Sequence, residues 1–157
     1  MILALHAVAG AALASGSNNV VVAAVLGLIS HYFLDTISHT DYDMGKVENG
    51  EIQMSDTAPV KIAVDLLIGA LVIFYALHTG RLHYFASTLV GAFFGILPDG
   101  LAFFDYHIKN KDNNIFTRFL KNHRIMHDKI HLEAELPIIQ YFCQIVVVVF
   151  LLYMIFK

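Results

Sequence analysis

Five apolar stretches alternate with polar connections along this chain of 157 residues, at about 2–14, 19–39, 60–79, 84–106 and 138–156. The last four are long enough to cross a hydrocarbon core of roughly 30 Å as helices. At about 1.5 Å per residue the first reaches only about 20 Å, so it could be tilted, re-entrant or extended by a few residues. The pattern therefore predicts an all-α bundle of four or five transmembrane segments, with residues 1–157 forming a single membrane domain.

The polar connections differ in character. Ser15–Asn19 and Asp41–Pro59 are rich in Gly, Asn, Ser and Asp, which favour turns. Over residues 115–136, apolar residues and histidines recur at helical spacing while Arg118 and Lys121 fall off that line. This stretch predicts an amphipathic helix at the membrane surface. Pro137 predicts the boundary before the last apolar segment.

Composition agrees with a membrane protein, because 57% of the residues are hydrophobic and only 15% are charged. The net charge of -3 and the lack of a basic cluster argue against nucleic acid as a partner, and leave membrane lipids as the expected one. Residues 2–14 could be taken for a signal peptide. However, no Lys or Arg precedes them and His6 interrupts them, so we expect them to be retained.

The distribution of cations predicts the orientation. If every segment crosses, the connections 40–60 and 107–136 lie on the side of the N-terminus. That side carries Lys46, Lys61, Lys109, Lys111, Arg118, Lys121, Arg124 and Lys129, and the other side carries Arg81 and Lys157. Because cytoplasmic loops are enriched in Lys and Arg, we expect the N-terminus and both long connections in the cytoplasm.

Two histidine-rich ladders are the most distinctive chemical feature. His31, Asp35 and His39 stand at i, i+4 and i+8, and His123, His127 and His131 repeat that spacing. On a helix such residues stack on one face with Cβ atoms about 5–6 Å apart, close enough for a pair to chelate one ion. The spacing therefore indicates metal binding. His31 is about 12 Å from His39 along a helix axis, so it could either bind the ion or orient another ligand.

Ionisable residues inside the apolar segments strengthen this interpretation. Asp35, Asp65 and Asp99 lie in or at the rim of such segments, where a charge costs about 2.5–3.5 kcal/mol on insertion scales. We expect histidines and a metal ion to be their partners. With His6 near the start of the first segment, all of these groups fall toward the cytoplasmic side.

The predicted metal ligands are His6, His31, Asp35, His39, Asp99, His123, His127 and His131. Nitrogen and carboxylate ligands without cysteine favour zinc, with manganese or iron as alternatives. Asp35 or Asp128 could act as a general base, and Arg124 or Lys121 could hold an anionic head group. His78 and His83 flank Arg81 at the opposite end and are interpreted as ordinary interfacial residues.

Four short motifs resemble one protein family. They are His6-Ala7-Val8-Ala9-Gly10, Ser30-His31 with Asp35, Leu97-Pro98-Asp99, and His123-Arg124 with His127. They are similar to elements of the bacterial inner-membrane, LexA-regulated metal-dependent hydrolases. In that family the Ser-His element follows the His-Arg element, whereas here it precedes it. The resemblance implies a small protein of the inner (plasma) membrane with a His/Asp metal centre and hydrolase activity.

The resulting hypothesis is a membrane-embedded metal-dependent hydrolase that acts at the cytoplasmic membrane surface, on a phospholipid or a lipid-linked phosphate. One alternative is a haem- or metal-binding membrane subunit without hydrolase activity. Another is a di-iron oxidase or desaturase-like enzyme, suggested by nine histidines, although adjacent histidine pairs are absent.

Overall fold

The computed structural model describes residues 3–37, 39, 47–48, 51–52, 57–107 and 137–157. In this part of the chain the helices are α1 (Leu3–Ala14), α2 (Val20–Asp35), α3 (Ala58–His78), α4 (Phe85–His107) and α6 (Pro137–Phe156). Two short strands, β1 (Val47–Glu48) and β2 (Glu51–Ile52), pair antiparallel. The predicted all-α class is confirmed, because these two-residue strands are the only departure from helix among the described elements.

Helix α2 ends earlier than the apolar pattern predicts. Its last residue is Asp35, and the chain then leaves the helix through a tighter turn. In it the backbone N–H groups of Thr36 and Ile37 donate to the carbonyls three residues earlier, at 3.2 and 3.0 Å. Such bonds commonly close the last turn of a helix. His39 therefore lies beyond the helix, and the predicted three-residue ladder with His31 and Asp35 is wrong at its last member.

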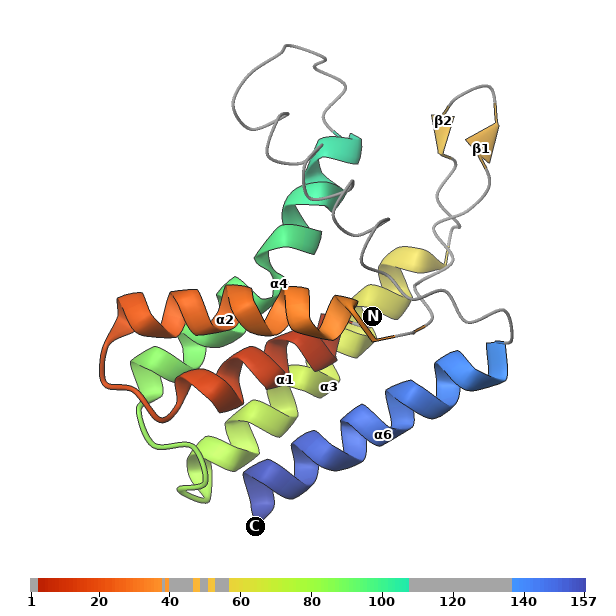
Figure 1. Cartoon of the computed structure of the whole chain (residues 1–157). Coiled ribbons are helices and arrows are strands. Elements are labelled where there is room, and N and C mark those ends of the chain that lie inside the picture. The colour runs from red at the N-terminus through yellow and green to blue at the C-terminus, as the bar shows by residue number, and fades with distance from the viewer. Residues whose placement is uncertain (1–2, 38, 40–46, 49–50, 53–56, 108–136) are drawn as a thin grey trace.

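Helix α1 is the centre of the bundle. It packs against α2, α3, α4 and α6, and Figure 1 shows it beside α2 as an antiparallel hairpin. Nine of its twelve residues are buried. A helix that is apolar on every side needs neighbours on every side, which explains the central place of this short segment.

Glycines let α1 and α4 approach backbone to backbone. A Cβ atom added to Gly91 would lie 2.2 Å from the Cβ of Ala14, and one added to Gly95 would lie 2.4 Å from the carbonyl oxygen of His6. A Cβ added to Gly10 would lie 2.3 Å from the carbonyl oxygen of Gly91. Gly91 and Gly95 form the G-x-x-x-G spacing that lets apolar helices pack closely without a hydrophobic driving force.

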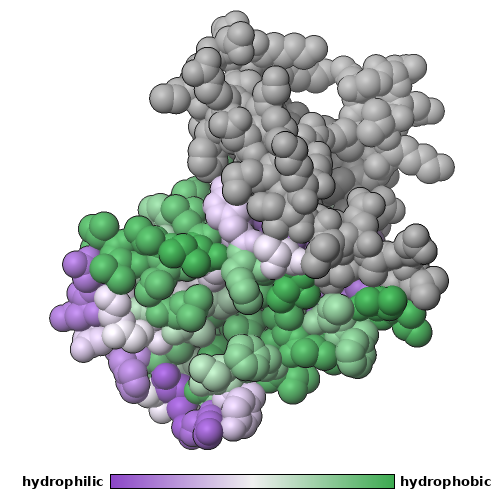
Figure 2. All heavy atoms as spheres, in the orientation of Figure 1, coloured by the Kyte–Doolittle hydropathy of each residue, from purple (hydrophilic) through white to green (hydrophobic). Residues whose placement is uncertain are grey.

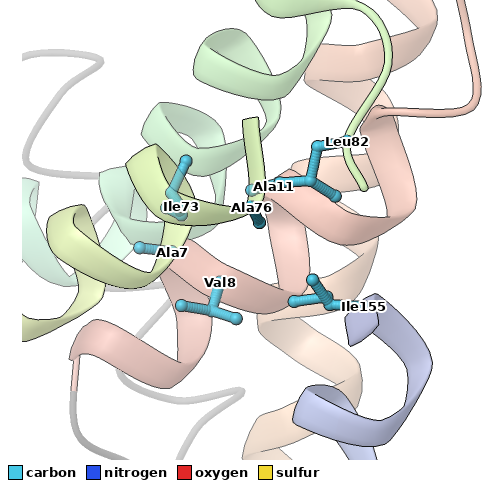
Figure 3. Close-up of a cluster of buried hydrophobic side chains, with 7 residues drawn as sticks. All are labelled: Ala7, Val8, Ala11, Ile73, Ala76, Leu82 and Ile155. Carbon is cyan, nitrogen blue, oxygen red and sulfur yellow. The ribbon is translucent and has the colours of Figure 1, made fainter. Parts of the chain in front are cut away.

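Small side chains on α1 also form the main apolar core, where α3 and α6 meet it (Figure 3). The buried members of this cluster are Ala7, Val8, Ala11, Ile73, Ala76, Leu82 and Ile155. A second cluster joins α1 to α2 and α6 through Leu5, Ala9, Leu34 and Val147. The two clusters fix the outer helices around α1.

The outward faces of α3 and α6 are apolar over most of their length, with Lys61 and His78 exposed at the two ends of α3. α3 exposes Val60, Val64, Leu67, Leu71 and Phe74, and α6 exposes Ile138, Phe142, Ile145, Val149 and Tyr153. Both helices are long and apolar enough to cross a membrane, by length and composition, and only 17% of the most apolar window of each is buried. Figure 2 shows hydrophobic residues over much of the described surface, with hydrophilic residues gathered toward its edge.

One end of the bundle holds the C-terminus and two short connections, 15–19 between α1 and α2 and 79–84 between α3 and α4 (Figure 1). There the Arg81 guanidinium donates from Nη1 to the carbonyl of Lys157 at 3.2 Å. Leu82 belongs to the same core cluster as Ile155. The opposite end holds the start of α1, the end of α2 and the start of α3. The chain thus alternates between two ends, as the five apolar segments predict.

The same glycine-to-alanine substitution at two positions of α4 tests the close contact between α1 and α4. Gly91→Ala should destabilise the fold by about 1–3 kcal/mol, because its Cβ has no space. Gly100→Ala in the same helix meets nothing within 4 Å and should be neutral or stabilising, since alanine favours helix over glycine by about 1 kcal/mol. Denaturant unfolding in detergent micelles measures both, and equal stability of the two variants would contradict the glycine contact.

Candidate metal centre

Four polar side chains from three helices converge near one end of the bundle. His6 comes from the first half of α1, His31 and Asp35 are one turn apart at the end of α2, and Asp99 follows Pro98 in α4. Helices α1, α2 and α4 all contact one another. The glycine contact between α1 and α4 therefore brings residues that are far apart in sequence to one point.

Each imidazole faces both carboxylates. His6 Nε2 lies 3.4 Å from Asp35 Oδ1 and 3.9 Å from Asp99 Oδ2. His31 Nε2 lies 3.2 Å from Asp35 Oδ2 and 3.9 Å from Asp99 Oδ1. The two imidazole rings are stacked at a tilt, with centroids 4.4 Å apart. The Nε2 atoms of both histidines thus point into the space between the two aspartates.

A backbone carbonyl fixes the orientation of His31. Its Nδ1 lies 2.9 Å from the carbonyl oxygen of Gly95. A carbonyl only accepts hydrogen bonds, so Nδ1 carries a proton and donates. When the imidazole is neutral, its lone pair is on Nε2, which faces the carboxylates. Metal-ligating histidines use this arrangement, in which the second ring nitrogen donates to a fixed acceptor.

Burying these imidazole and carboxylate groups costs free energy unless a hydrogen bond or an opposite charge compensates them. His6 and His31 are fully buried, and Asp35 is 2% exposed. Within the described residues, neither ring nitrogen of His6 makes a hydrogen bond, nor does Asp35 Oδ2, despite its short distance to His31. A buried polar group without a hydrogen bond costs about 1–3 kcal/mol, and a buried carboxylate needs a compensating positive charge. A divalent cation bound between the four side chains would satisfy both needs.

The separations fit such an ion. Ligand atoms of His6, His31 and Asp99 lie within 4.8 Å of one another. At metal–ligand distances of about 2.0–2.2 Å, two ligands at a tetrahedral angle are about 3.3–3.6 Å apart. The four nitrogen–oxygen distances, from 3.2 to 3.9 Å, bracket that range. The described residues therefore form a buried group that could hold a metal ion.

Asp99 is the most exposed of the four side chains. Its side chain is 28% exposed, whereas that of Asp35 is 3% exposed and those of both histidines are buried. Among the described residues, solvent therefore contacts the site most readily at Asp99.

The structure brings four of the eight predicted ligands together. His6, His31, Asp35 and Asp99 come together. His39 is buried, and its Nδ1 donates to the carbonyl of Ile37 at 2.6 Å, so its role as a ligand stays a prediction. The other predicted site residues, His123, Arg124, His127, Asp128 and His131, lie outside the described residues, as do Lys121 and the predicted amphipathic helix.

Asp65 makes one contact that the sequence did not predict, with the backbone at the start of α1. Its Oδ2 accepts a hydrogen bond from the backbone N–H of Ala4 at 2.8 Å. The first N–H groups of a helix have no partner within the helix, and a negative charge there interacts favourably with the helix dipole. Asp65 thus joins α3 to the start of α1.

The sequence interpretation did not identify Gly95 as part of the site. Its carbonyl orients His31, and its lack of a side chain lets α1 approach. The G-x-x-x-G spacing of Gly91 and Gly95 within an apolar segment was the available signal for close packing. No sequence pattern signals which carbonyl a histidine will meet.

Comparison of this chain with protein-family models, with curated proteins and with solved structures finds no match. The function of this chain is therefore inferred from its own residues.

Histidine substitutions test the metal centre directly. We expect the purified wild type to bind one divalent ion at this site, and His6→Ala and His31→Ala to lose it, because each removes a buried ligand. His83→Ala, an exposed histidine at the other end of the bundle, should keep full metal content. Elemental analysis after equilibration with zinc measures all four proteins, and full zinc content in His6→Ala and His31→Ala would refute the site.

Proposed function

We propose that this chain is a membrane-embedded metal-dependent hydrolase that acts at the cytoplasmic surface of the bacterial inner membrane. A phospholipid or a lipid-linked phosphate is the proposed substrate, and zinc the proposed metal, with manganese or iron as alternatives. The observation that carries the proposal is the convergence of His6, His31, Asp35 and Asp99 in a site that is partly exposed at Asp99. Imidazole and carboxylate ligands around an accessible position are typical of catalytic rather than closed structural zinc sites.

The apolar surface supports membrane insertion. Monomeric soluble proteins rarely expose apolar patches larger than a few hundred Å², whereas here the outward faces of two long helices are apolar over most of their length. In lipid those faces need no partner. The hydrophilic connections would then lie at the membrane surface, and the cation distribution favours the end that holds the metal site as the cytoplasmic one.

The depth of the site supports a lipid substrate. His6 is the fourth residue of α1, about 5 Å from its start along the axis, and His31 is about 6 Å from the end of α2. The site would therefore lie just below the surface of the apolar layer, near the level of lipid head groups. A phosphoester bond of a membrane lipid could reach it without leaving the bilayer.

The chain supplies binding and orientation to this chemistry. His31, held by Gly95, and His6 present lone pairs, and Asp35 supplies compensating negative charge. A divalent cation held there would supply Lewis-acid chemistry, activating water near neutral pH and stabilising charge on a phosphoryl or carbonyl oxygen. The surrounding helices bury the other three side chains, so that among the described residues bulk water contacts the site most readily at Asp99.

The resemblance to the LexA-regulated metal-dependent hydrolases supports the same function. Three of its four short motifs contribute the residues of this site. The histidine of the first comes from α1, the Ser-His-Asp element lies on α2, and Asp99 ends the third on α4.

A metal-carrying subunit without activity is the second candidate, favoured by the near-complete burial of His6, His31 and Asp35. The geometry disfavours haem between His6 and His31, because ring centroids 4.4 Å apart leave no room for a porphyrin. The described residues supply ligands for one ion, which gives no specific support to a di-iron centre.

Hydrolysis in lipid vesicles tests the function. The zinc-loaded protein, reconstituted with a phosphatidic acid or a lipid-linked diphosphate, should release phosphate, and His6→Ala should lower the rate by about 100-fold or more. His83→Ala should retain it. Failure of the metal-loaded wild type to hydrolyse any lipid phosphoester would favour the inactive, metal-carrying alternative.

A further inference from the structure

The two aspartates of the site differ in distance, burial and surroundings. Asp35 oxygens lie 3.2 and 3.4 Å from the two histidine nitrogens, whereas both Asp99 oxygens lie 3.9 Å away. The side chain of Asp35 is 3% exposed, and that of Asp99 is 28% exposed. The first carboxylate is therefore held tightly, and the second is the more exposed.

Asp99 lies one turn beyond Gly95, at the point where α4 leaves its close contact with α1. Pro98, on the side of Gly95, is fully buried. On the other side, a Cβ added to Gly100 would meet nothing within 4 Å among the described residues, although one added to Gly91 or Gly95 in the same helix would clash. Figure 1 shows the last turns of α4 extending away from the bundle. Asp99 therefore lies at the edge of the packed part of α4.

We infer that Asp99 is an exchangeable ligand, whose place substrate oxygen takes when it enters, while His6, His31 and Asp35 form the permanent set. This inference rests on the proposed metal site and assigns different roles to its carboxylates. Three fixed ligands with a fourth, open position are the arrangement of catalytic zinc sites. The open position would face the side on which the site is most exposed. A substrate oxygen or an inorganic phosphate would occupy it.

Cobalt(II) replaces zinc in the test, because its visible absorption reports the number and type of ligands, and inorganic phosphate is the probe. Substitution of a residue that only supports a metal ligand typically lowers metal affinity by about 10–100-fold. Asp35→Ala should lower cobalt affinity by more than about 100-fold, because it removes a permanent ligand. Asp99→Ala should lower it by about tenfold or less. Phosphate should alter the wild-type spectrum, and Asp99→Ala should respond at a lower phosphate concentration because the competing carboxylate is gone.

Asp65→Ala is the matched control, since it removes an aspartate of the same bundle that bonds to the backbone of α1 and is not one of the four side chains of the site. It should bind cobalt and respond to phosphate like the wild type. If the wild type binds no cobalt, the metal site and the inference are both wrong. If it binds cobalt but Asp99→Ala loses the ion as completely as Asp35→Ala, or shows no stronger response to phosphate, only the exchangeable role of Asp99 is wrong.

Discussion

The close contact between α1 and α4 is the constraint on which the rest of the structure depends. Gly10, Gly91 and Gly95 leave no room for side chains between the two backbones, so the helices lie at a fixed register. That register brings Asp99 within reach of His6. A second close contact, of Gly27 in α2 with Gly91 and Gly95 in α4, places the Gly95 carbonyl beside His31. Packing and metal chemistry therefore share one turn of α4. A side chain at Gly95 would separate the helices and displace the site together.

Charge balance explains how the site could hold an ion. Two carboxylates and two imidazoles lie among apolar helices, and in the described part of the chain Asp35 has no Lys or Arg partner. A buried carboxylate without a cation is strongly unfavourable, and more so in a bilayer than in a soluble core. A divalent ion would neutralise the two aspartates while the histidines remain neutral. Under the proposed function, the placement near one end of the bundle would let a substrate approach from the membrane surface.

Much of the fold could be predicted from the sequence, because the length of an apolar run limits where a helix can begin and end. α3, α4 and α6 begin and end within two residues of their predicted segments. The end of α2 could not be read in this way, since the helix ends in a tighter backbone turn at Thr36 and Ile37, inside an otherwise apolar run. The ladder that included His39 was wrong for that reason.

The sequence could predict that histidines and aspartates form the candidate site, but not which of them come together. Spacing on one helix identified His31 and Asp35, because neighbours at i and i+4 share a face. Which other helix faces them depends on rotation about each helix axis, which no single sequence specifies. Asp65 therefore resembled Asp99 in the sequence but bonds to the backbone of α1.

X-ray absorption at the zinc edge of the loaded wild-type protein tests the central claim most directly. The account predicts a first shell of nitrogen and oxygen at about 2.0–2.2 Å, with the outer-shell scattering of two imidazoles and no sulfur. A shell that contains the sulfur of Cys143, or one without imidazole scattering, would contradict the site.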